Sequence, residues 1–315
     1  MRALVWDGER AKVVDRAPEP ECPSGTALVE VIAAGICSTD LQILKGYMDF
    51  RGVLGHEMVG RVVAGPSELR GRRVVAEINF ACGRCQACAA GRRRHCPTRT
   101  VMGILRADGA FADFVRVPID NLHPVPDGLE DHAAVFVEPL AAAFRAEEQT
   151  RDHASGRTIV IGAGKLGLLV AQVLARRGDD VSVVFRSEAG ERRLRLLGLQ
   201  AVPMERAKAG ADLVVEASGS ALGFEAALDL VRPLGAILMK STIADEHQLG
   251  LARLVVEEVT VIGSRCGPFP PALAALAAGE IRVDPLIDAV LSLENAVEAL
   301  DRAGRPGAGK ILLQP

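Results

Sequence analysis

Cysteine, histidine and acidic residues form two groups whose spacing suits metal ions. The denser group lies in INFACGRCQACAAGRRRHCPTRT, residues 78–100, which holds four of the chain's seven cysteines. Cys82, Cys85 and Cys88 are each separated by two residues, and Cys96 follows after seven more. Short turns at this spacing place four thiolates tetrahedrally around zinc, and four sulfurs leave no open position for a substrate. The sequence predicts a structural zinc site here, with an iron site of the same ligands as the chemical alternative.

Disulfide bonds between these cysteines are the alternative to metal binding. Seven is an odd number, and the N-terminal residues carry charges where a signal peptide would need an apolar segment. We therefore expect the chain in a reducing cytoplasm, where structural disulfides are rare, and interpret the cysteines as metal ligands. No uninterrupted apolar run has the length of a membrane span, so a soluble protein without membrane contact is expected.

The second group mixes ligand types, in GICSTDLQILKGYMDFRGVLGHEMVG. It contains Cys37, His56 and Glu57, with the Thr39 hydroxyl and the Asp40 carboxylate close by in sequence. Taken singly, such residues have structural explanations, because cysteine is often a small core residue and a lone histidine is usually only hydrogen-bonded. Together they match a catalytic zinc with an open position. Asp40 would accept a hydrogen bond from the ligating histidine and fix its tautomer.

Glu138 lies with Pro139 in the otherwise apolar segment AAVFVEPLAAAFRA. A carboxylate there is costly to bury unless it is paired or bound to a metal. From these residues alone, a glutamate that caps a helix or faces solvent is the simpler interpretation. Glu138 is therefore a candidate ligand that needs further support.

A glycine-rich loop predicts a dinucleotide site. In RTIVIGAGKLGLLVAQVLARRG, Gly162, Gly164 and Gly167 follow an apolar strand and open a long amphipathic helix, together with Lys165 and Leu166. Glycines at this spacing allow a tight turn and a close approach of the backbone to a pyrophosphate, whose charge the helix N-terminus attracts. A plain tight turn is the alternative for the motif alone, but the strand and helix around it favour the cofactor.

The end of the next strand bears on the choice of cofactor. An NAD-binding unit usually offers an aspartate or glutamate there to the ribose hydroxyls, and this chain has Phe185. Arg186 and Ser187 follow directly, and Arg192 comes about one turn later, so a 2′-phosphate would meet donors instead of a repelling carboxylate. We therefore expect NADP(H) rather than NAD(H); the alternative is that these arginines are only solvated.

The elements that must position these groups change character along the chain. A length of 315 residues favours two domains, and the net charge of −3 argues against a nucleic-acid or membrane-surface binder held by charge. Short β-rich runs between Gly and Pro predict an irregular, mostly-β first part: residues 27–33, 61–64, 73–78 and 112–117. From about Thr158, apolar strands alternate with Ala- and Leu-rich helices, which is typical of a parallel sheet wrapped by helices. Residues 294–315 predict a helix, a loop and a last strand.

Together these motifs resemble the zinc-containing medium-chain dehydrogenase/reductase family, nearest its sorbitol, threonine and glucose dehydrogenase branch. The resemblance spans nearly the full length and rests on GICSTD, GHEMVG, CGRCQACAAGRRRHC, VEPL, GAGKLG, EASG, VIGSRCG and GKILL. It implies an α/β fold with a GroES-like, mostly-β catalytic domain, residues 1–142 and 283–315, whose structural zinc lobe covers about 80–98. A Rossmann coenzyme domain with a doubly wound parallel sheet would occupy residues 143–282. Relatives form dimers or tetramers, so a homodimer or homotetramer is expected.

The resemblance also implies roles for single residues. Cys37 and His56 would ligate the catalytic zinc, with Glu57 or Glu138 supplying a carboxylate in different states of the cycle. Thr39 would hydrogen-bond the substrate oxygen and start a proton relay. Further residues fall where relatives contact the cofactor, near its nicotinamide end or its phosphates: Ser218, Ser264, Arg265 and Lys310.

Two departures from the family pattern affect these expectations. Gln42 stands where many relatives have a histidine three residues after the relay threonine, and an amide neither gives nor takes a proton near neutral pH. The relay would then pass through cofactor ribose and water. The segment after GHEMVG forms a shorter loop than usual and places Pro66 where Gly or Ala is expected.

The expected activity is reversible hydride transfer between a secondary alcohol and the nicotinamide cofactor, on a polyol, sugar, cyclitol or amino alcohol. One alternative is a zinc-ribbon nucleic-acid binder that uses the four cysteines with the basic run 92–95. Three arginines in a row are more often a solvated loop, and no aromatic platform for base stacking accompanies them. The other alternative is a non-catalytic dinucleotide sensor on the same fold. An alcohol or ketone substrate, and no nucleic acid, is the expected partner.

Overall fold

The computed structural model describes residues 1–153, 156–242 and 250–315. The chain divides into two compact units. The first unit consists of Met1–Glu138, Ile287–Arg305 and Lys310–Pro315, and the second of Pro139–Leu286 and Pro306–Gly309. Both units recruit separate stretches of chain, so residues far apart in sequence meet within each. The domain limits expected from the sequence remain a prediction.

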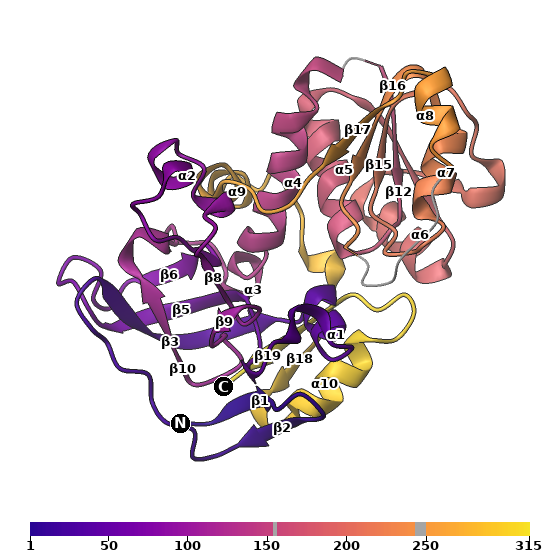
Figure 1. Ribbon diagram of the computed structural model, residues 1–315. Coiled ribbons are helices and arrows are strands. Elements are labelled where there is room, and N and C mark those ends of the chain that lie inside the picture. Colours follow the sequence, from indigo (N-terminus) through magenta and orange to yellow (C-terminus); the bar gives the residue numbers. More distant parts are fainter. Residues whose placement is uncertain (154–155, 243–249) are drawn as a thin grey trace. The chain divides into compact units, whose positions relative to one another are not determined.

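The first unit is built on a seven-stranded sheet of order β11-β6-β5-β3-β19-β18, with β10 also paired to β3. In Figure 1 the yellow C-terminal strands complete the sheet begun by the indigo and purple ones. The apolar runs of the sequence form these strands: β3 (Thr26–Gly35), β5 (Glu57–Ala64), β6 (Arg73–Ala76), β10 (Phe114–Pro118), β11 (Leu122–Pro124), β18 (Ile287–Ser292) and β19 (Lys310–Gln314). β19 runs antiparallel to β3, with Leu312 opposite Gly35. β3 therefore lies between β19 and β5, and the last strand is separated from the start of β5 by one strand.

Smaller elements surround this sheet in the first unit. Two three-stranded sheets have the orders β2-β1-β4 and β7-β8-β9. Their strands are β1 (Ala3–Trp6), β2 (Ala11–Val14), β4 (Gly52–Val53), β7 (Asn79–Phe80), β8 (Thr100–Met102) and β9 (Arg106–Ala107). The helices are short: α1 (Ser38–Ile43), α2 (Gln86–Ala89), α3 (Asp131–Ala134) and α10 (Ala296–Ala303). The mostly-β character expected for this part is confirmed.

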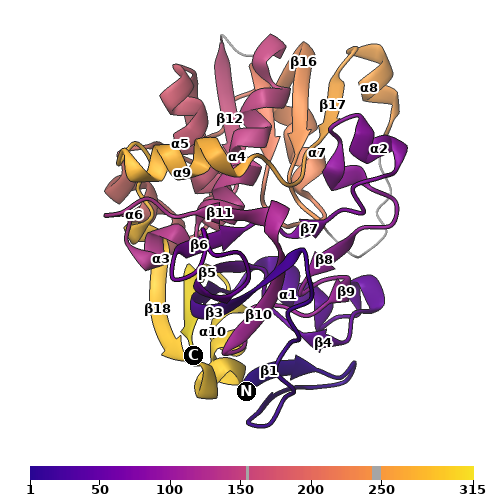
Figure 2. The same ribbon diagram turned by 90° about the vertical axis from the view of Figure 1, so that its left-hand side faces the viewer.

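The second unit holds a six-stranded parallel sheet of order β14-β13-β12-β15-β16-β17, with helices on both faces (Figures 1 and 2). Its strands are β12 (Arg157–Ile161), β13 (Asp180–Phe185), β14 (Gln200–Pro203), β15 (Ala211–Glu216), β16 (Val231–Met239) and β17 (Thr260–Gly263). Its helices are α4 (Val137–Gln149), which begins in the first unit, α5 (Lys165–Arg177), α6 (Glu188–Leu197), α7 (Gly223–Leu230), α8 (Ala252–Val256) and α9 (Phe269–Ala277). The strand order reverses between β12 and β15, and such a switch point is where doubly wound sheets bind ligands.

The α/β fold with a Rossmann-type sheet is therefore confirmed. The helix and strand expected at the C-terminus are α10 and β19. β14 was not expected, because Gln200–Pro203 is a short edge strand without a long apolar run. Among the described residues, no helix is both long and apolar enough to span a membrane.

Candidate active site

The structure brings Cys37, His56 and Glu57 together in the first unit, and we call these three residues the mixed-ligand cluster. One ligand atom from each lies within 4.8 Å of the others. Cys37 is the N-cap residue of α1, directly after β3, and Glu57 opens β5. Because Gly35 pairs with Glu57 across these two strands, the sheet register sets the spacing of the cluster.

Asp40 links the two halves of the mixed-ligand cluster. Its Oδ2 accepts a hydrogen bond from the Cys37 N–H at 2.8 Å, and its Oδ1 lies 3.3 Å from His56 Nδ1. That second contact has the distance of an ion pair but not the angles of a hydrogen bond. Burial alone would lower the pKa of His56, but the Asp40 carboxylate raises it well above its ordinary value. Asp40 thus turns Nδ1 toward itself and leaves Nε2 as the free ligand atom.

Lys310 forms the cationic side of the site. Its Nζ makes an ion pair with Glu57 Oε2 and donates to the Ile36 carbonyl at 3.3 Å, and its side chain is 1% exposed. Burial lowers the pKa of Lys310, but the charges of Glu57, Cys37 and Asp40 and the hydrogen bond to Glu57 together outweigh this, so the pKa is raised. A Cβ at position 35 would lie 2.7 Å from Glu57 Oε2, which explains the glycine there. The phosphate-binding role expected for Lys310 stays a prediction, and this buried placement does not favour it.

The donor set fits a metal ion. Glu57 Oε1 is buried and has no hydrogen-bond partner among the residues that the structure describes, although Oε2 is paired with Lys310. A buried carboxylate oxygen without a partner costs free energy, which a bound cation would recover. Thiolate, imidazole and carboxylate are the ligands of catalytic zinc sites, where a fourth position stays open.

Three further predicted residues differ in their relation to the cluster. Thr39 is close: its Oγ1 accepts from Cys37 Sγ at 3.7 Å, a long contact typical of sulfur. Gln42 follows on α1 and is half-buried. Glu138 lies at the start of α4, half-buried, and does not belong to the group of ligand atoms within 4.8 Å. Its role as an alternating zinc ligand therefore stays a prediction.

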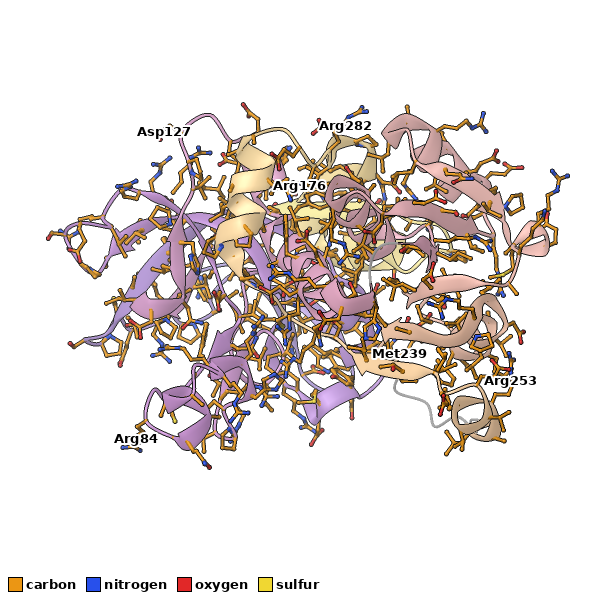
Figure 3. All side chains as sticks on the ribbon, turned by 90° about the horizontal axis from the view of Figure 1, so that it is seen from above. Arg84, Asp127, Arg176, Met239, Arg253 and Arg282 are labelled. Carbon is orange, nitrogen blue, oxygen red and sulfur yellow. The ribbon has the colours of Figure 1, made fainter. Side chains whose placement is uncertain are left out.

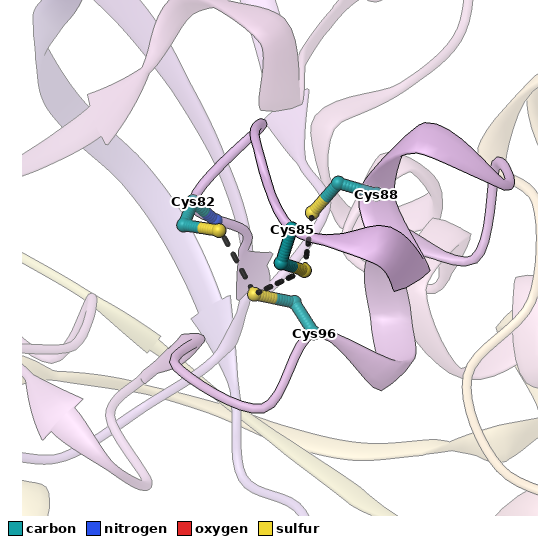
Figure 4. A group of neighbouring side chains, drawn as sticks. All are labelled: Cys82, Cys85, Cys88 and Cys96. Atoms are coloured by element: carbon teal, nitrogen blue, oxygen red, sulfur yellow. Dashed lines mark hydrogen bonds between the residues drawn. The ribbon is translucent and has the colours of Figure 1, made fainter.

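The four cysteines of the first stretch also meet, and we call them the four-cysteine cluster (Figure 4). Their sulfurs all lie within 4.8 Å of one another, and all seven cysteines of the chain are free thiols. Cys85 Sγ lies 3.5 Å from Cys88 Sγ and 3.8 Å from Cys96 Sγ. A disulfide would need about 2.05 Å. The geometry fits one ion held by four sulfurs.

The thiols of this cluster differ in acidity. Hydrogen bonds from the Arg84 backbone and the Thr98 hydroxyl lower the pKa of Cys82 to about 6. Burial and contact with Cys85 raise the pKa of Cys88 to about 11. The thiolate of Cys82 is therefore present near neutral pH before a metal arrives, and thiols that are still protonated lose their protons on binding.

The glycine-rich loop has the expected form in the second unit. Gly162 has φ +110°, and Gly167 approaches it so closely that a Cβ at position 167 would lie 2.0 Å from the Gly162 carbonyl oxygen. Gly164 is the N-cap of α5 and offers no side chain to the first amides, while a Cβ there would meet no atom within 4 Å. Open space in front of uncapped helix amides fits a bound phosphate. Lys165 and Leu166 begin the helix.

The segment after β13 carries the residues expected to read the ribose. Phe185 is half-buried and ends the strand, and Arg186 and Arg192 are exposed. Ser187 is the N-cap of α6 and its Oγ accepts from the Gly190 N–H at 3.1 Å, so this hydroxyl is partly used. Glu188 stands in the first turn of α6, where it adds a negative charge to the segment expected to contact the ribose.

Two buried charged residues at the carboxyl edge of the parallel sheet were not expected. Lys240 directly follows β16, whose last residue, Met239, is labelled in Figure 3. The Nζ of Lys240 donates to Ala142 O, Ser264 Oγ and Arg265 O at 3.1–3.2 Å. It thereby fixes the segment that contains the predicted Ser264 and Arg265. Glu216 ends β15, is fully buried, and accepts from both the N–H and the Oγ of the predicted Ser218. The sequence signal that could have found both is a charged residue at the end of an apolar strand or directly after it.

Comparison with known families and proteins gives a consistent picture. Residues 23–127 match the alcohol dehydrogenase GroES-like domain. D-altritol 5-dehydrogenase of Agrobacterium fabrum is 32% identical over 299 residues, which cover 88% of this chain and 88% of that protein. Sorbitol dehydrogenase of Halalkalibacterium halodurans is 28% identical, over 100% of this chain and 99% of that protein.

Solved structures of dehydrogenases are similar to this chain in fold. An alcohol dehydrogenase from Thermus sp. ATN1 has a TM-score of 0.87 at 29% identity, covering 100% of this chain and 99% of its own. A structure from Sinorhizobium meliloti, described as a zinc-binding dehydrogenase bound to NADP, has a TM-score of 0.90 at 28% identity, with the same coverage. The similarity thus extends over both units of the chain.

Proposed function

The chain belongs to the zinc-type alcohol dehydrogenase family and is an alcohol oxidoreductase, and from that premise we propose its metal sites, cofactor and substrate class. The proposed reaction is reversible hydride transfer between a secondary alcohol and NADP(H), with zinc held by Cys37, His56 and Glu57. One observation carries the metal assignment: three different donor types meet within 4.8 Å in a buried place, with a carboxylate oxygen left unpartnered. Zinc bound there would supply Lewis acidity toward the alcohol oxygen.

The residues around this centre have separate tasks in the proposal. Asp40 orients the His56 ring, and Lys310 holds one carboxylate oxygen of Glu57, so the other oxygen would be available to bind the metal. Thr39 takes the hydrogen bond of the substrate hydroxyl and passes its proton outward. Gln42 cannot take this proton from Thr39 as an acid or base, since an amide does not titrate near neutral pH. The proton therefore leaves by way of water.

The proposed substrates are polyols and sugar alcohols. Two relatives are named for altritol and sorbitol, and both are similar to most or all of this chain. The test is oxidation of a panel of polyols, sugars, cyclitols and amino alcohols with NADP and NAD, with zinc measured on the same sample. Turnover on polyols supports the proposal. Stoichiometric NADPH binding without turnover across the panel would favour the dinucleotide sensor instead.

The preference for NADP(H) rests on Phe185, Arg186 and Arg192. Phe185 removes the carboxylate that would repel a 2′-phosphate, and the exposed guanidinium groups can pair with one. We expect kcat/KM to favour NADP over NAD, and Phe185→Asp to shift that ratio by about tenfold or more toward NAD, which is about 1.4 kcal/mol. The exposed Arg116 of β10 offers a control, Arg116→Gln, that leaves the ratio unchanged. A wild-type preference for NAD would contradict this assignment.

A homodimer or homotetramer is also part of the proposal. β17 ends the parallel sheet, and in α8, a few residues before it, Val255 and Val256 are 77% and 81% exposed. β17 pairs with β16 on one side, and its other edge pairs with no strand among the described residues. An edge strand near exposed apolar side chains is a surface that a second copy can cover by two-fold pairing. Light scattering should show a dimer or tetramer, and Val256→Asp should weaken it. A wild-type monomer at micromolar concentration would refute this part.

A further inference from the structure

Four arginines surround a cavity of about 380 Å³ in the first unit, apart from both cysteine-containing clusters. We call it the arginine pocket, and its lining residues are Arg61, Arg70, Gly71, Arg72, Arg73, Val125 and Asp127. Asp127, labelled in Figure 3, lies in the loop after β11. We propose that the arginine pocket binds a small anion that carries phosphate groups, independently of the hydride-transfer site.

The pocket is a product of the β5–β6 hairpin, whose connecting loop is the short one that contains Pro66. In this hairpin Arg61 lies directly opposite Arg73 in the antiparallel register. Like charges directly opposite each other across two strands destabilise a sheet. Arg70 and Arg72 add two more positive charges from the loop that joins the strands. The hairpin therefore concentrates repulsion that a bound anion would relieve.

Most of this charge is not neutralised by the protein. Arg73 pairs with Asp131 at 2.7 Å, whereas Arg61, Arg70 and Arg72 form no ion pair with any residue that the structure describes. Asp127 is the one acidic residue in the lining. Glu30 lies opposite Arg61 on β3, but the two are not joined. With four arginines and one aspartate, the lining keeps a net positive charge.

Two of the guanidinium groups are already fixed in place. Arg73 donates from Nη1 to Leu129 O at 2.8 Å and from Nη2 to Pro126 O at 3.1 Å. Arg61 donates from Nη1 to Gly71 O at 2.9 Å, which leaves Nε and Nη2 for a ligand. Groups that are held before binding lose less conformational entropy when the ligand arrives.

The lining also selects the chemical class of the ligand. Val125 is its single large apolar residue, so the pocket has little to offer an apolar compound. The planar fork of arginine matches phosphate oxygens and forms two parallel hydrogen bonds with them. A volume near the lower limit of ligand pockets, which span roughly 300–1,000 Å³, suits a small molecule with one or two phosphate groups.

The test uses pyrophosphate and inorganic phosphate as probes, titrated calorimetrically into the full-length protein at constant ionic strength. The double variant Arg70→Gln/Arg72→Gln removes two exposed charges without touching the hydrogen bonds of Arg61 and Arg73. The variant Arg116→Gln is the control, since Arg116 is an exposed arginine on the same sheet and forms no ion pair with a described residue. We expect wild type and control to bind pyrophosphate more tightly than phosphate, and the double variant to lose at least about tenfold in affinity.

Pyrophosphate also resembles part of a dinucleotide, so the titration is repeated with NADPH present at saturation. Binding at the arginine pocket persists in the presence of NADPH and stays sensitive to the double variant. Absence of binding to wild type at millimolar pyrophosphate overturns the proposal. Equal binding by wild type and the double variant, whether or not NADPH is present, places the anion elsewhere and overturns it as well. Circular dichroism of each variant confirms that the fold is unchanged.

Discussion

Zinc would have a structural role in one of the two cysteine-containing clusters of the first unit and a catalytic role in the other. The four-cysteine cluster takes identical ligands from one stretch of 15 residues, Cys82 to Cys96, around the short helix α2. The mixed-ligand cluster takes different ligands from the N-cap of α1 and from the start of β5, with the buried charges of Asp40 and Lys310 around them. In the proposal, the first arrangement would be complete without a substrate, while the second would leave a ligand position to be filled.

This difference teaches that the number of cysteines is a poor guide to where the chemistry lies. Four thiolates satisfy zinc and make metal binding part of the folding free energy. A set of one thiolate, one imidazole and one carboxylate leaves room for a substrate, and its neighbours control charge and orientation. In the proposal, the conspicuous stretch is a structural clip, and the solitary Cys37 belongs to the reacting centre.

The largest expected effect separates the clusters by activity. Cys37→Ser or His56→Ala should lower kcat by at least about 10³-fold, since loss of metal assistance removes several kcal/mol of transition-state stabilisation. Zinc content should fall by one ion per chain, and the melting temperature should change little. The control is Cys22→Ser, a half-buried cysteine outside both clusters. Full turnover in a variant shown to lack that zinc would contradict the comparison.

The next effect separates the clusters by stability. Cys96 is fully buried and its sulfur lies 3.8 Å from that of Cys85 (Figure 4), so Cys96→Ser should release the zinc proposed for the four-cysteine cluster. We expect the melting temperature to fall by at least about 10 °C, because metal binding there contributes several kcal/mol of folding free energy. Turnover per folded molecule, measured well below that temperature, should stay close to wild type. A variant that melts normally but is inactive would reverse the two assignments.

A smaller effect tests the buried charges of the mixed-ligand cluster. In zinc-free protein, Lys310→Met leaves the Glu57 carboxylate buried without its partner, and breaking such a pair costs about 3–5 kcal/mol. The free energy of unfolding in urea should fall accordingly. The double variant Lys310→Met/Glu57→Gln removes both charges and should recover much of this loss. Equal destabilisation by the single and double variants would show that the charge pair is not what Lys310 contributes.

Sequence patterns predicted one kind of feature and missed another. Both metal clusters and the glycine-rich loop follow from spacing within short stretches, and the apolar runs predicted most of the strands. The contact between Glu57 and Lys310 joins residues 253 positions apart, and it depends on β19 pairing with β3. The arginine pocket likewise depends on the register of one hairpin. Local spacing does not encode such contacts, because tertiary pairing of distant strands decides them.

The smallest effect concerns the thiols of the four-cysteine cluster in zinc-free protein. A pKa of about 6 for Cys82 means that its thiolate is present above pH 6 and is lost as the pH falls below it. Cys88, with a pKa of about 11, stays protonated at neutral pH. At pH 7.5 iodoacetamide should therefore modify Cys82 at least about tenfold faster than Cys88, because the thiolate is the nucleophile. Peptide mapping measures both rates, and equal rates would contradict the unequal environments.

Cobalt substitution tests the central claim, that the mixed-ligand cluster is the reacting centre and the four-cysteine cluster is not. Cobalt(II) is added stepwise to zinc-free protein while its absorption spectrum and turnover are recorded together. A site with four sulfurs and a site with mixed ligands give different spectra. We expect turnover to rise with the mixed-ligand spectrum, and an added alcohol substrate to change only that spectrum. Turnover that follows the four-sulfur spectrum, or a substrate-induced change in it, would contradict the account.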